Sequence, residues 1–246
     1  MKIILCGAGG RMGKVCTEII ESGFCGGELV AAVDPTKPAL ACPTYASLSE
    51  VKEVADVLID FSHHSATASI LEFAKARKLP VVIATTGQTD EEKEAIRAAA
   101  AELPVFFSGN MSIGIALLIS LAKKAASVFP DADVEIVETH HNRKLDVPSG
   151  TALMIAEGIR EARGSGEFVI GRHTHGKRTE GEIGIHSLRL GNVVGEHEIR
   201  INTGTQTLVL KHEAHDRALF AEGAMTAAAF LVEQKSGLWN VNDLFG

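Results

Sequence analysis

The sequence is poor in several features that mark whole classes of protein. Aromatic residues make up only 5% of the 246 residues, with one Trp and one Tyr, too few for stacking platforms that bind bases. Basic residues are outnumbered, with 24 Lys and Arg against 31 Asp and Glu. The resulting net charge of −7 argues against general binding to nucleic acid or to an anionic membrane.

Cysteine pairs and long apolar runs are also missing. The four cysteines, Cys6, Cys16, Cys25 and Cys42, include no C-x-x-C pair, so we expect free thiols in a reducing compartment. The longest nearly apolar stretch, residues 113–122, is about half of a membrane span. Glycine interrupts the apolar N-terminus too early for a signal peptide, and we expect a cytoplasmic protein.

Short apolar runs alternate with helical segments through the first half of the chain. Strands of the kind buried in a parallel sheet are predicted over residues 2–6, 29–33, 56–60, 81–84 and 105–107. Helices are predicted over 12–22, 66–78 and 90–102, and a capping box of Thr89 and Glu92 starts the last. This alternation predicts an α/β fold with a Rossmann-type, doubly wound parallel sheet.

The pattern changes after a long apolar helix predicted over residues 112–129. A strand over 134–138, a polar loop and a helix ending at Arg163 follow. Runs that alternate apolar and polar residues, typical of a half-exposed mixed sheet, then cover residues 184–190, 198–201 and 207–211. An Ala-rich helix is predicted over 218–233, so the second half is an α+β region.

The first strand runs into the turn Gly7-Ala8-Gly9-Gly10-Arg11-Met12-Gly13, followed by a helix, a second strand and Asp34. In dinucleotide-binding folds such a turn brings backbone amides to the pyrophosphate, and the acid accepts both ribose hydroxyls. The spacing departs from G-x-G-x-x-G, because Met12 stands at the third glycine position. The alternative is a glycine-rich turn in an ordinary βαβ unit. Asp34 would repel the 2′-phosphate of NADPH, whereas Lys37 could pair with it.

Two further loops follow strands of the same predicted sheet. Because ligands of doubly wound sheets lie at the carboxyl ends of the strands, we expect both loops to face the cofactor. Their small residues suit contacts to a ribose and a carboxamide, unless they are turn residues only. They are Ala84, Thr85, Thr86, Ser108, Gly109, Asn110 and Met111.

Residues 138–151 place two imidazoles, two cations and a helix start within one loop. An imidazole can deliver a proton near neutral pH, while Lys144 and the amides around Gly150 and Thr151 could hold carboxylates. Arg189 is one more candidate for carboxylate contact. The paired histidines could instead be loop filler or metal ligands, but no third His or Cys stands at a ligand spacing, and we predict no metal.

The other histidines are less specific. His63 and His64 follow the strand over 56–60 and could touch the cofactor. For most of the remainder we expect a surface or subunit-contact role. They are His173, His175, His186, His197, His212 and His215.

Taken together, these motifs resemble the 4-hydroxy-tetrahydrodipicolinate reductase family, also called dihydrodipicolinate reductase, of the diaminopimelate route to lysine. The stretch over 138–151 is the most specific of them. The matching pieces run in the family's order over nearly the whole chain: residues 7–13, 60–62, 84–87, 109–112, 138–151, 186–195 and 217–224.

The resemblance implies a dinucleotide-binding domain of residues 1–111 and 217–246, with an inserted substrate-binding and tetramerisation domain of residues 112–216. It also implies a cytoplasmic homotetrameric oxidoreductase that transfers a hydride from NADH or NADPH to a small cyclic dicarboxylate. By position, the proton donors would be His140 and Lys144, and the carboxylate ligands would be His141, Lys144, Gly150 and Thr151. The cofactor would be held by Gly7, Ala8, Gly9, Gly10, Arg11, Met12, Gly13, Asp34 and the loops 84–86 and 108–111.

Two positions depart from the family pattern. Pro35 stands where some members have a basic residue after the ribose acid, and His63 stands where some have an Arg. Two other functions also remain open. A dehydrogenase of an open-chain amino diacid would leave residues 138–151 without an explanation. A non-catalytic redox sensor would be expected to carry a basic DNA-binding segment, which the sequence lacks.

Overall fold

The computed structural model describes residues 1–245. Within them the chain forms two compact units, one of Met1–Ser112 with the segment from Arg217 onward, and one of Ile113–Asp216. Each unit has its own sheet and its own apolar core. Across residues 1–245, no helix combines the length and the apolar character needed to cross a membrane.

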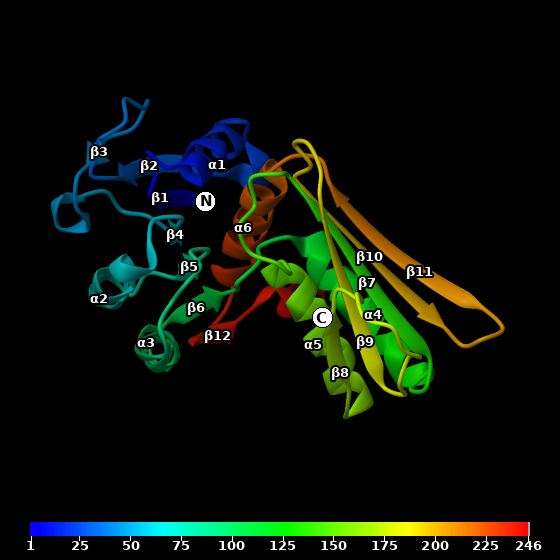
Figure 1. Cartoon of the computed structure of the whole chain (residues 1–246). Helices are drawn as coiled ribbons and strands as arrows, with labels where there is room; N and C mark the ends of the chain where they lie inside the picture. The colour runs from blue at the N-terminus through cyan, green and yellow to red at the C-terminus, as the bar shows by residue number, and fades with distance from the viewer. Residues whose placement is uncertain (246) are drawn as a thin grey trace. The chain divides into compact units, whose positions relative to one another are not determined.

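The first unit contains a seven-stranded parallel sheet in the order β12-β6-β5-β4-β1-β2-β3 (Figure 1). Its strands are β1 (Lys2–Cys6), β2 (Glu28–Val33), β3 (Thr44–Tyr45), β4 (Val57–Asp60), β5 (Val81–Ile83), β6 (Pro104–Phe107) and β12 (Gly237–Trp239). The helices are α1 (Arg11–Glu21), α2 (Thr67–Arg77), α3 (Asp90–Ala100) and α6 (Ala218–Leu231). Short 3₁₀ helices are η1 (Phe24–Gly26), η2 (Leu48–Glu50), η3 (His64–Ala66) and η4 (Val241–Phe245).

The central strands form because they are apolar on both faces. Ile4, Leu58 and Val81 pack with residues of α2 and α3 in one core. Their neighbours Ile3 and Ile59 point to the opposite face and are equally buried, since side chains alternate along a strand. Each such burial stabilises the fold by roughly 1.5–3 kcal/mol. The predicted Rossmann-type parallel sheet is confirmed.

Local signals in the first unit also agree with the structure. Thr89 caps α3, with its hydroxyl accepting from the Glu92 amide and the Glu92 carboxylate accepting from the Thr89 amide at 2.8 Å. The capping box was therefore predicted correctly. Three short strands, β3, β12 and β8 (Glu167–Ile170), were not predicted, and each forms at an edge of a sheet against a single neighbouring strand.

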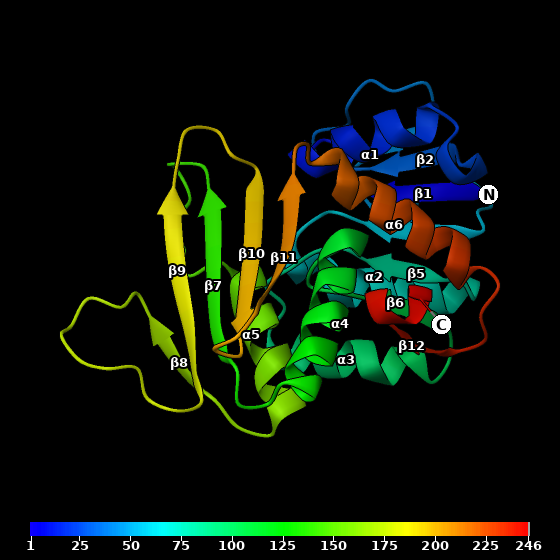
Figure 2. The same cartoon turned by 90° about the vertical axis from the view of Figure 1, so that its right-hand side faces the viewer.

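The second unit contains a five-stranded mixed sheet in the order β11-β10-β7-β9-β8, seen side by side in Figure 2. Its other strands are β7 (Asp133–His140), β9 (Glu182–Arg189), β10 (Gly195–Asn202) and β11 (Thr207–Ala214), and its helices are α4 (Ile113–Val128) and α5 (Gly150–Arg163). The central strand β7 runs parallel to β9 and antiparallel to β10. Burial alternates along β10, which confirms the predicted half-exposed mixed sheet.

Two glycines inside helices provide a matched test of packing. A Cβ on Gly223 in α6 would collide with the backbone carbonyl of Met111, whereas one on Gly158 in α5 would meet only the side chains of Ile119 and Lys123. We expect Gly223→Ala to lower the free energy of unfolding by about 1–3 kcal/mol, despite the higher helix propensity of alanine. Gly158→Ala should change it by less than about 1 kcal/mol. Denaturation followed by circular dichroism compares them, and equal stability of the two variants would contradict the packing.

Candidate active site

The glycine-rich turn between β1 and α1 is tightly packed. Gly7 has a φ of +79°, and a Cβ on it would lie 2.5 Å from the backbone of Phe61. A Cβ on Gly13 would collide with the carbonyl of Gly7, so only glycine lets α1 approach the turn this closely. The N-cap residue of α1 is Gly10, which offers no side-chain cap. The first amides of α1 therefore remain able to bind an anion.

Asp34 follows β2 and faces the same turn. One carboxylate oxygen accepts from the Gly9 amide at 2.9 Å, and the other accepts from the amide and hydroxyl of Thr36 at 2.8 and 2.6 Å. Burial raises the pKa of Asp34, but these bonds outweigh it, and the pKa lies below its ordinary value. An ionised carboxylate has room for further donors, so Asp34 can still accept from two hydroxyls of a ligand.

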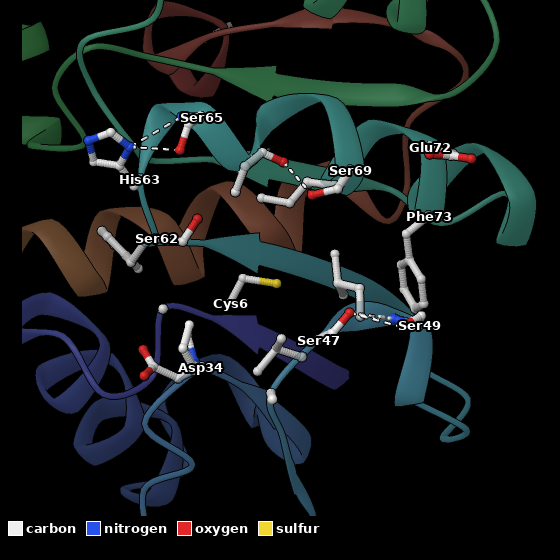
Figure 3. A pocket seen from close by; sticks show the side chains of 18 of the residues that line it. Cys6, Asp34, Ser47, Ser49, Ser62, His63, Ser65, Ser69, Glu72 and Phe73 are labelled. Atoms are coloured by element: carbon white, nitrogen blue, oxygen red, sulfur yellow. Dashed lines mark hydrogen bonds between the residues drawn. The ribbon is translucent and has the colours of Figure 1, made fainter.

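A cavity of about 770 Å³ opens beside Asp34 within the first unit (Figure 3). Gly7, Gly10 and Asp34 line it, together with Ser62, His63 and Phe73. Its size suits part of a dinucleotide, and the uncapped start of α1 and the ionised Asp34 supply the polar groups that such a ligand needs. The loops 84–86 and 108–111 do not line this cavity.

Those two loops use their hydroxyls internally. The hydroxyl of Thr85 donates to the fully buried Asp60 at 2.6 Å, and that of Ser108 donates to the carbonyl of Asn110 at 2.7 Å. Asp60 also accepts from the amide and hydroxyl of Ser62 at 2.9 and 2.5 Å. Burial raises its pKa, and these bonds act in the opposite direction. The hydroxyls of Thr85 and Ser108 thus stabilise the loops.

In the second unit, His140 lies at the end of β7 within a buried polar network. Its Nδ1 is 2.5 Å from Oε2 of Glu138, and Arg189 from β9 donates to both oxygens of Glu138 at 2.9 and 3.0 Å. Burial raises the pKa of Glu138, but hydrogen bonds from His140 and Arg189 outweigh it and lower the pKa to about 2. Glu138 is therefore ionised at neutral pH.

Arg189 was expected to be a further contact for a substrate carboxylate. Its two terminal nitrogens bind Glu138 instead. The same nitrogens also donate to the carbonyl oxygens of Leu188 and Asp146, each of these two bonds being 2.7 Å long. The guanidinium thus belongs to the network that surrounds His140.

A second buried histidine, His197 on β10, completes this network. It is 3% exposed, so it is not one of the surface histidines expected among the scattered ones. Its ring lies edge-on to that of His140, with centroids 5.2 Å apart, and its Nε2 is 3.2 Å from the hydroxyl of Ser149. Burial and the charge of His140 lower the pKa of His197 to about 3. His197 is therefore neutral beside His140.

The loop after β7 brings the predicted carboxylate ligands together. Nζ of Lys144 lies 2.9 Å from the carboxylate of Asp146, and the Gly150 amide also bonds to Asp146. These contacts lower the pKa of Asp146, first through Lys144. Lys144 and the start of α5 thus already bind one carboxylate of the chain itself. His141 and Thr151 flank them and are half-buried.

The sequence does not predict a place in this network for Glu138, Ser149, Gly195 or His197. Glu138 and His140 are two apart on one strand, which places them on one face, so that pair could have been found. Arg189 and His197 come from the two strands that flank β7. Gly195 lies so close to His140 that a Cβ on it would be 3.1 Å from Nε2 of that ring.

No group of three or more His, Cys, Asp or Glu side chains in residues 1–245 is arranged to hold a metal ion.

The buried ion pair predicts a pH-dependent stability. Glu138→Gln leaves Arg189 without its carboxylate, so we expect a loss of about 3–5 kcal/mol at pH 7. The Glu138 carboxylate stabilises the fold above its unfolded-state pKa, near the ordinary 4.5, and this contribution disappears as the pH falls towards about 2. The difference between wild type and variant should therefore shrink between pH 4.5 and 2. Unfolding by guanidinium at several pH values measures it, and a constant difference would contradict an ionised Glu138.

Two family models match the chain, and both describe one family. They are "Dihydrodipicolinate reductase, N-terminus" over residues 1–111 and "Dihydrodipicolinate reductase, C-terminus" over residues 114–245. The chain is 46% identical to a 4-hydroxy-tetrahydrodipicolinate reductase of Caldanaerobacter subterraneus subsp. tengcongensis, covering 99% of this chain and 98% of that one. It is 39% identical to the protein of the same name from Alkaliphilus metalliredigens, covering 100% and 99%.

Solved structures show the same similarity. A dipicolinate-bound dihydrodipicolinate reductase from Paenisporosarcina sp. TG-14 superimposes with a TM-score of 0.83 at 29% identity, covering 98% of this chain and 97% of that one. A probable dehydrogenase from Thermotoga maritima has a TM-score of 0.63 at 12% identity, covering 99% and 92%, and shares the fold alone. Because the family models and the relatives span nearly the whole sequence, the chain belongs to the dihydrodipicolinate reductase family.

Proposed function

We propose that this protein catalyses the reduction of 4-hydroxy-tetrahydrodipicolinate to tetrahydrodipicolinate by NADH or NADPH, in the diaminopimelate route of lysine biosynthesis. In this reaction the substrate loses its hydroxyl group as water and gains one hydride and one proton. The proposal rests on one observation above the others: a histidine held by a buried carboxylate lies beside Lys144 and a helix start that already bind a carboxylate.

The residues of the second unit match the needs of this reaction. Adding a hydride to a conjugated, electron-poor ring creates negative charge that must be protonated, and an imidazolium at His140 is suited to supply the proton. Lys144 acts beside it as a second proton donor. The groups that bind Asp146 would exchange it for a substrate carboxylate. The substrate-binding residues are His141, Lys144, Gly150 and Thr151.

The first unit would hold the nicotinamide cofactor, which supplies the hydride when bound. The uncapped amides of α1 fit a pyrophosphate, and the ionised Asp34 fits the adenosine ribose. Asp34 and Glu72 line the cavity, while no Lys or Arg among the described residues does. Nζ of Lys37, the residue that could pair with a 2′-phosphate, lies 3.6 Å from the carboxylate of Glu50. We therefore propose that NADH binds more tightly than NADPH.

The two parts of the chain would have different roles. Residues 1–111 and 217–246 would bind the dinucleotide, and residues 112–216 would bind the substrate and join four copies into a tetramer. The four free cysteines suit a cytoplasmic enzyme. An open-chain diacid dehydrogenase and a non-catalytic redox sensor are not favoured, because the matched family covers both halves of the chain.

Activity can be tested with a coupled assay in which a synthase makes the unstable substrate in place and NADH absorbance is followed. We expect wild type to oxidise NADH only when substrate is produced. His140→Gln should lower kcat by about 10²- to 10⁴-fold with little change in KM for the substrate. Lys144→Ala should lower kcat and raise KM for the substrate. Wild-type turnover in His140→Gln would contradict the role of His140 as the proton donor. Absence of NADH and NADPH oxidation by the wild-type protein would overturn the proposed reaction.

Cofactor choice can be tested at Asp34. In Asp34→Ala we expect KM for NADH to rise about tenfold or more, because hydrogen bonds to a charged group are lost. KM for NADPH should rise less or fall, so the preference for NADH weakens. Lys37→Ala is the matched control and should leave the preference unchanged. An unaltered preference in Asp34→Ala would mean that Asp34 does not contact the ribose.

Assembly can be tested by light scattering. The sheet face opposite α4 and α5 carries the exposed apolar residues Leu188 and Val209, which suit a subunit contact. We expect a mass near four times 26.1 kDa for wild type and smaller species for Val209→Asp. A monomeric wild type at micromolar concentration would contradict the tetramer.

A further inference from the structure

The carboxylate of Glu138 is bound by four donors and has no exposed surface. Oε1 accepts from the Ser149 amide at 3.1 Å and from Nη2 of Arg189 at 3.0 Å. Oε2 accepts from Nη1 of Arg189 at 2.9 Å and contacts Nδ1 of His140 at 2.5 Å. Two carboxylate oxygens offer about four lone-pair sites, so the four contacts use the whole acceptor capacity of Glu138.

This arrangement determines which nitrogen of His140 carries a fixed proton. An ionised carboxylate can only accept hydrogen bonds, and Glu138 is held ionised by its donors. Nδ1 of His140 must therefore be the donor in the 2.5 Å contact. The nitrogen that gains and loses a proton is then Nε2, on the opposite side of the ring. The missing side chain of Gly195 keeps space open there, since a Cβ would lie 3.1 Å from Nε2.

Arg189 holds the carboxylate rather than a ligand. It pairs with Glu138 through both terminal nitrogens, and the same nitrogens bind the carbonyls of Leu188 and Asp146. In the parallel ladder of β7 and β9, Arg189 is the register partner of His140. A two-pronged guanidinium fixes the plane of a carboxylate, which an ammonium cannot do.

We propose that Glu138 and Arg189 are positioning residues for the reduction: Glu138 keeps the proton of His140 on Nδ1 and aims Nε2 at the substrate, and Arg189 fixes Glu138. This inference rests on the proposed role of His140 as proton donor. Neither residue touches the substrate, and both act through the orientation and tautomer of one imidazole. In other enzymes, a carboxylate that accepts a hydrogen bond from one ring nitrogen of a catalytic or metal-bound histidine fixes its tautomer and orientation.

A matched control separates this role from that of a structural ion pair. Glu182 stands at the opposite end of β9 from Arg189, is also buried, and pairs with Arg172 at 2.5 Å. Hydrogen bonds from Arg172 and Thr179 lower its pKa to about 2, as in Glu138. The hydrogen bonds of the Glu182 side chain go to Arg172 and Thr179, so Glu182→Gln removes a comparable ion pair without affecting the imidazole of His140.

The first measurement is the ¹⁵N NMR spectrum of the histidine rings in the full-length, ligand-free protein. We expect the neutral form of His140 in wild type and in Glu182→Gln to carry its proton on Nδ1. In Glu138→Gln the Nε2-protonated tautomer should become populated. Wild-type His140 protonated mainly on Nε2 would overturn the proposal. This readout needs no substrate, so it decides the placement of the proton even if the proposed reductase activity is not found.

The second measurement is steady-state kinetics in the coupled assay. Glu138→Gln should lower kcat by about 10- to 1,000-fold with KM for the substrate within about threefold of wild type, while Glu182→Gln keeps kcat within about twofold. The double variant Glu138→Gln/His140→Gln should be no slower than His140→Gln alone, because both act through one group. Additive losses, or a wild-type kcat in Glu138→Gln, would overturn the proposal.

Arg189→Lys provides a milder variant if Glu138→Gln does not fold. It keeps the positive charge next to Glu138 but loses the two-pronged contact. We expect a kcat between those of wild type and Glu138→Gln, and a tautomer mixture at His140. A wild-type kcat together with a wild-type ¹⁵N spectrum would remove Arg189 from the proposal.

Discussion

The buried carboxylate of Glu138 is the contact on which the rest of the proposed catalytic centre depends. It joins β7 to β9 through Arg189, 51 residues further along the chain, and to the start of α5 through the Ser149 amide. An unpaired buried charge strongly destabilises a fold, so the folded second unit requires that Arg189 and the Ser149 amide both reach Glu138. The same contact that stabilises the second unit therefore also orients His140.

The first unit uses a carboxylate in a similar way. Asp34 is held ionised by the Gly9 amide and by Thr36, which ties the glycine turn to the end of β2. The two carboxylates differ in their remaining capacity. Glu138 is saturated by protein donors and acts on a neighbouring side chain, whereas Asp34 can accept further bonds from a ribose. The number of protein donors around a carboxylate thus decides whether it orients a neighbouring side chain or binds a ligand.

The sequence predicted features that depend on local pattern and missed those that depend on strand register. Strands such as β1 and β4 are apolar on both faces, so their composition alone identifies them. His140, Lys144 and Gly150 stand close together in the chain, and their chemistry is visible in one loop. Arg189 and His197 approach His140 only because β9 and β10 flank β7. Short strands such as β3 and β12 likewise form only against a neighbouring strand.

In the proposed centre, Glu138 holds Nδ1 of His140 while Nε2 faces the substrate. Titration of ¹⁵N-labelled protein with dipicolinate, in the presence of the oxidised cofactor, tests it directly. We expect the Nε2 resonance of His140 to shift with dipicolinate concentration while the Nδ1 resonance keeps its protonated position. A shift of Nδ1 to an unprotonated position, or a His140 ring that does not respond to dipicolinate, would contradict it.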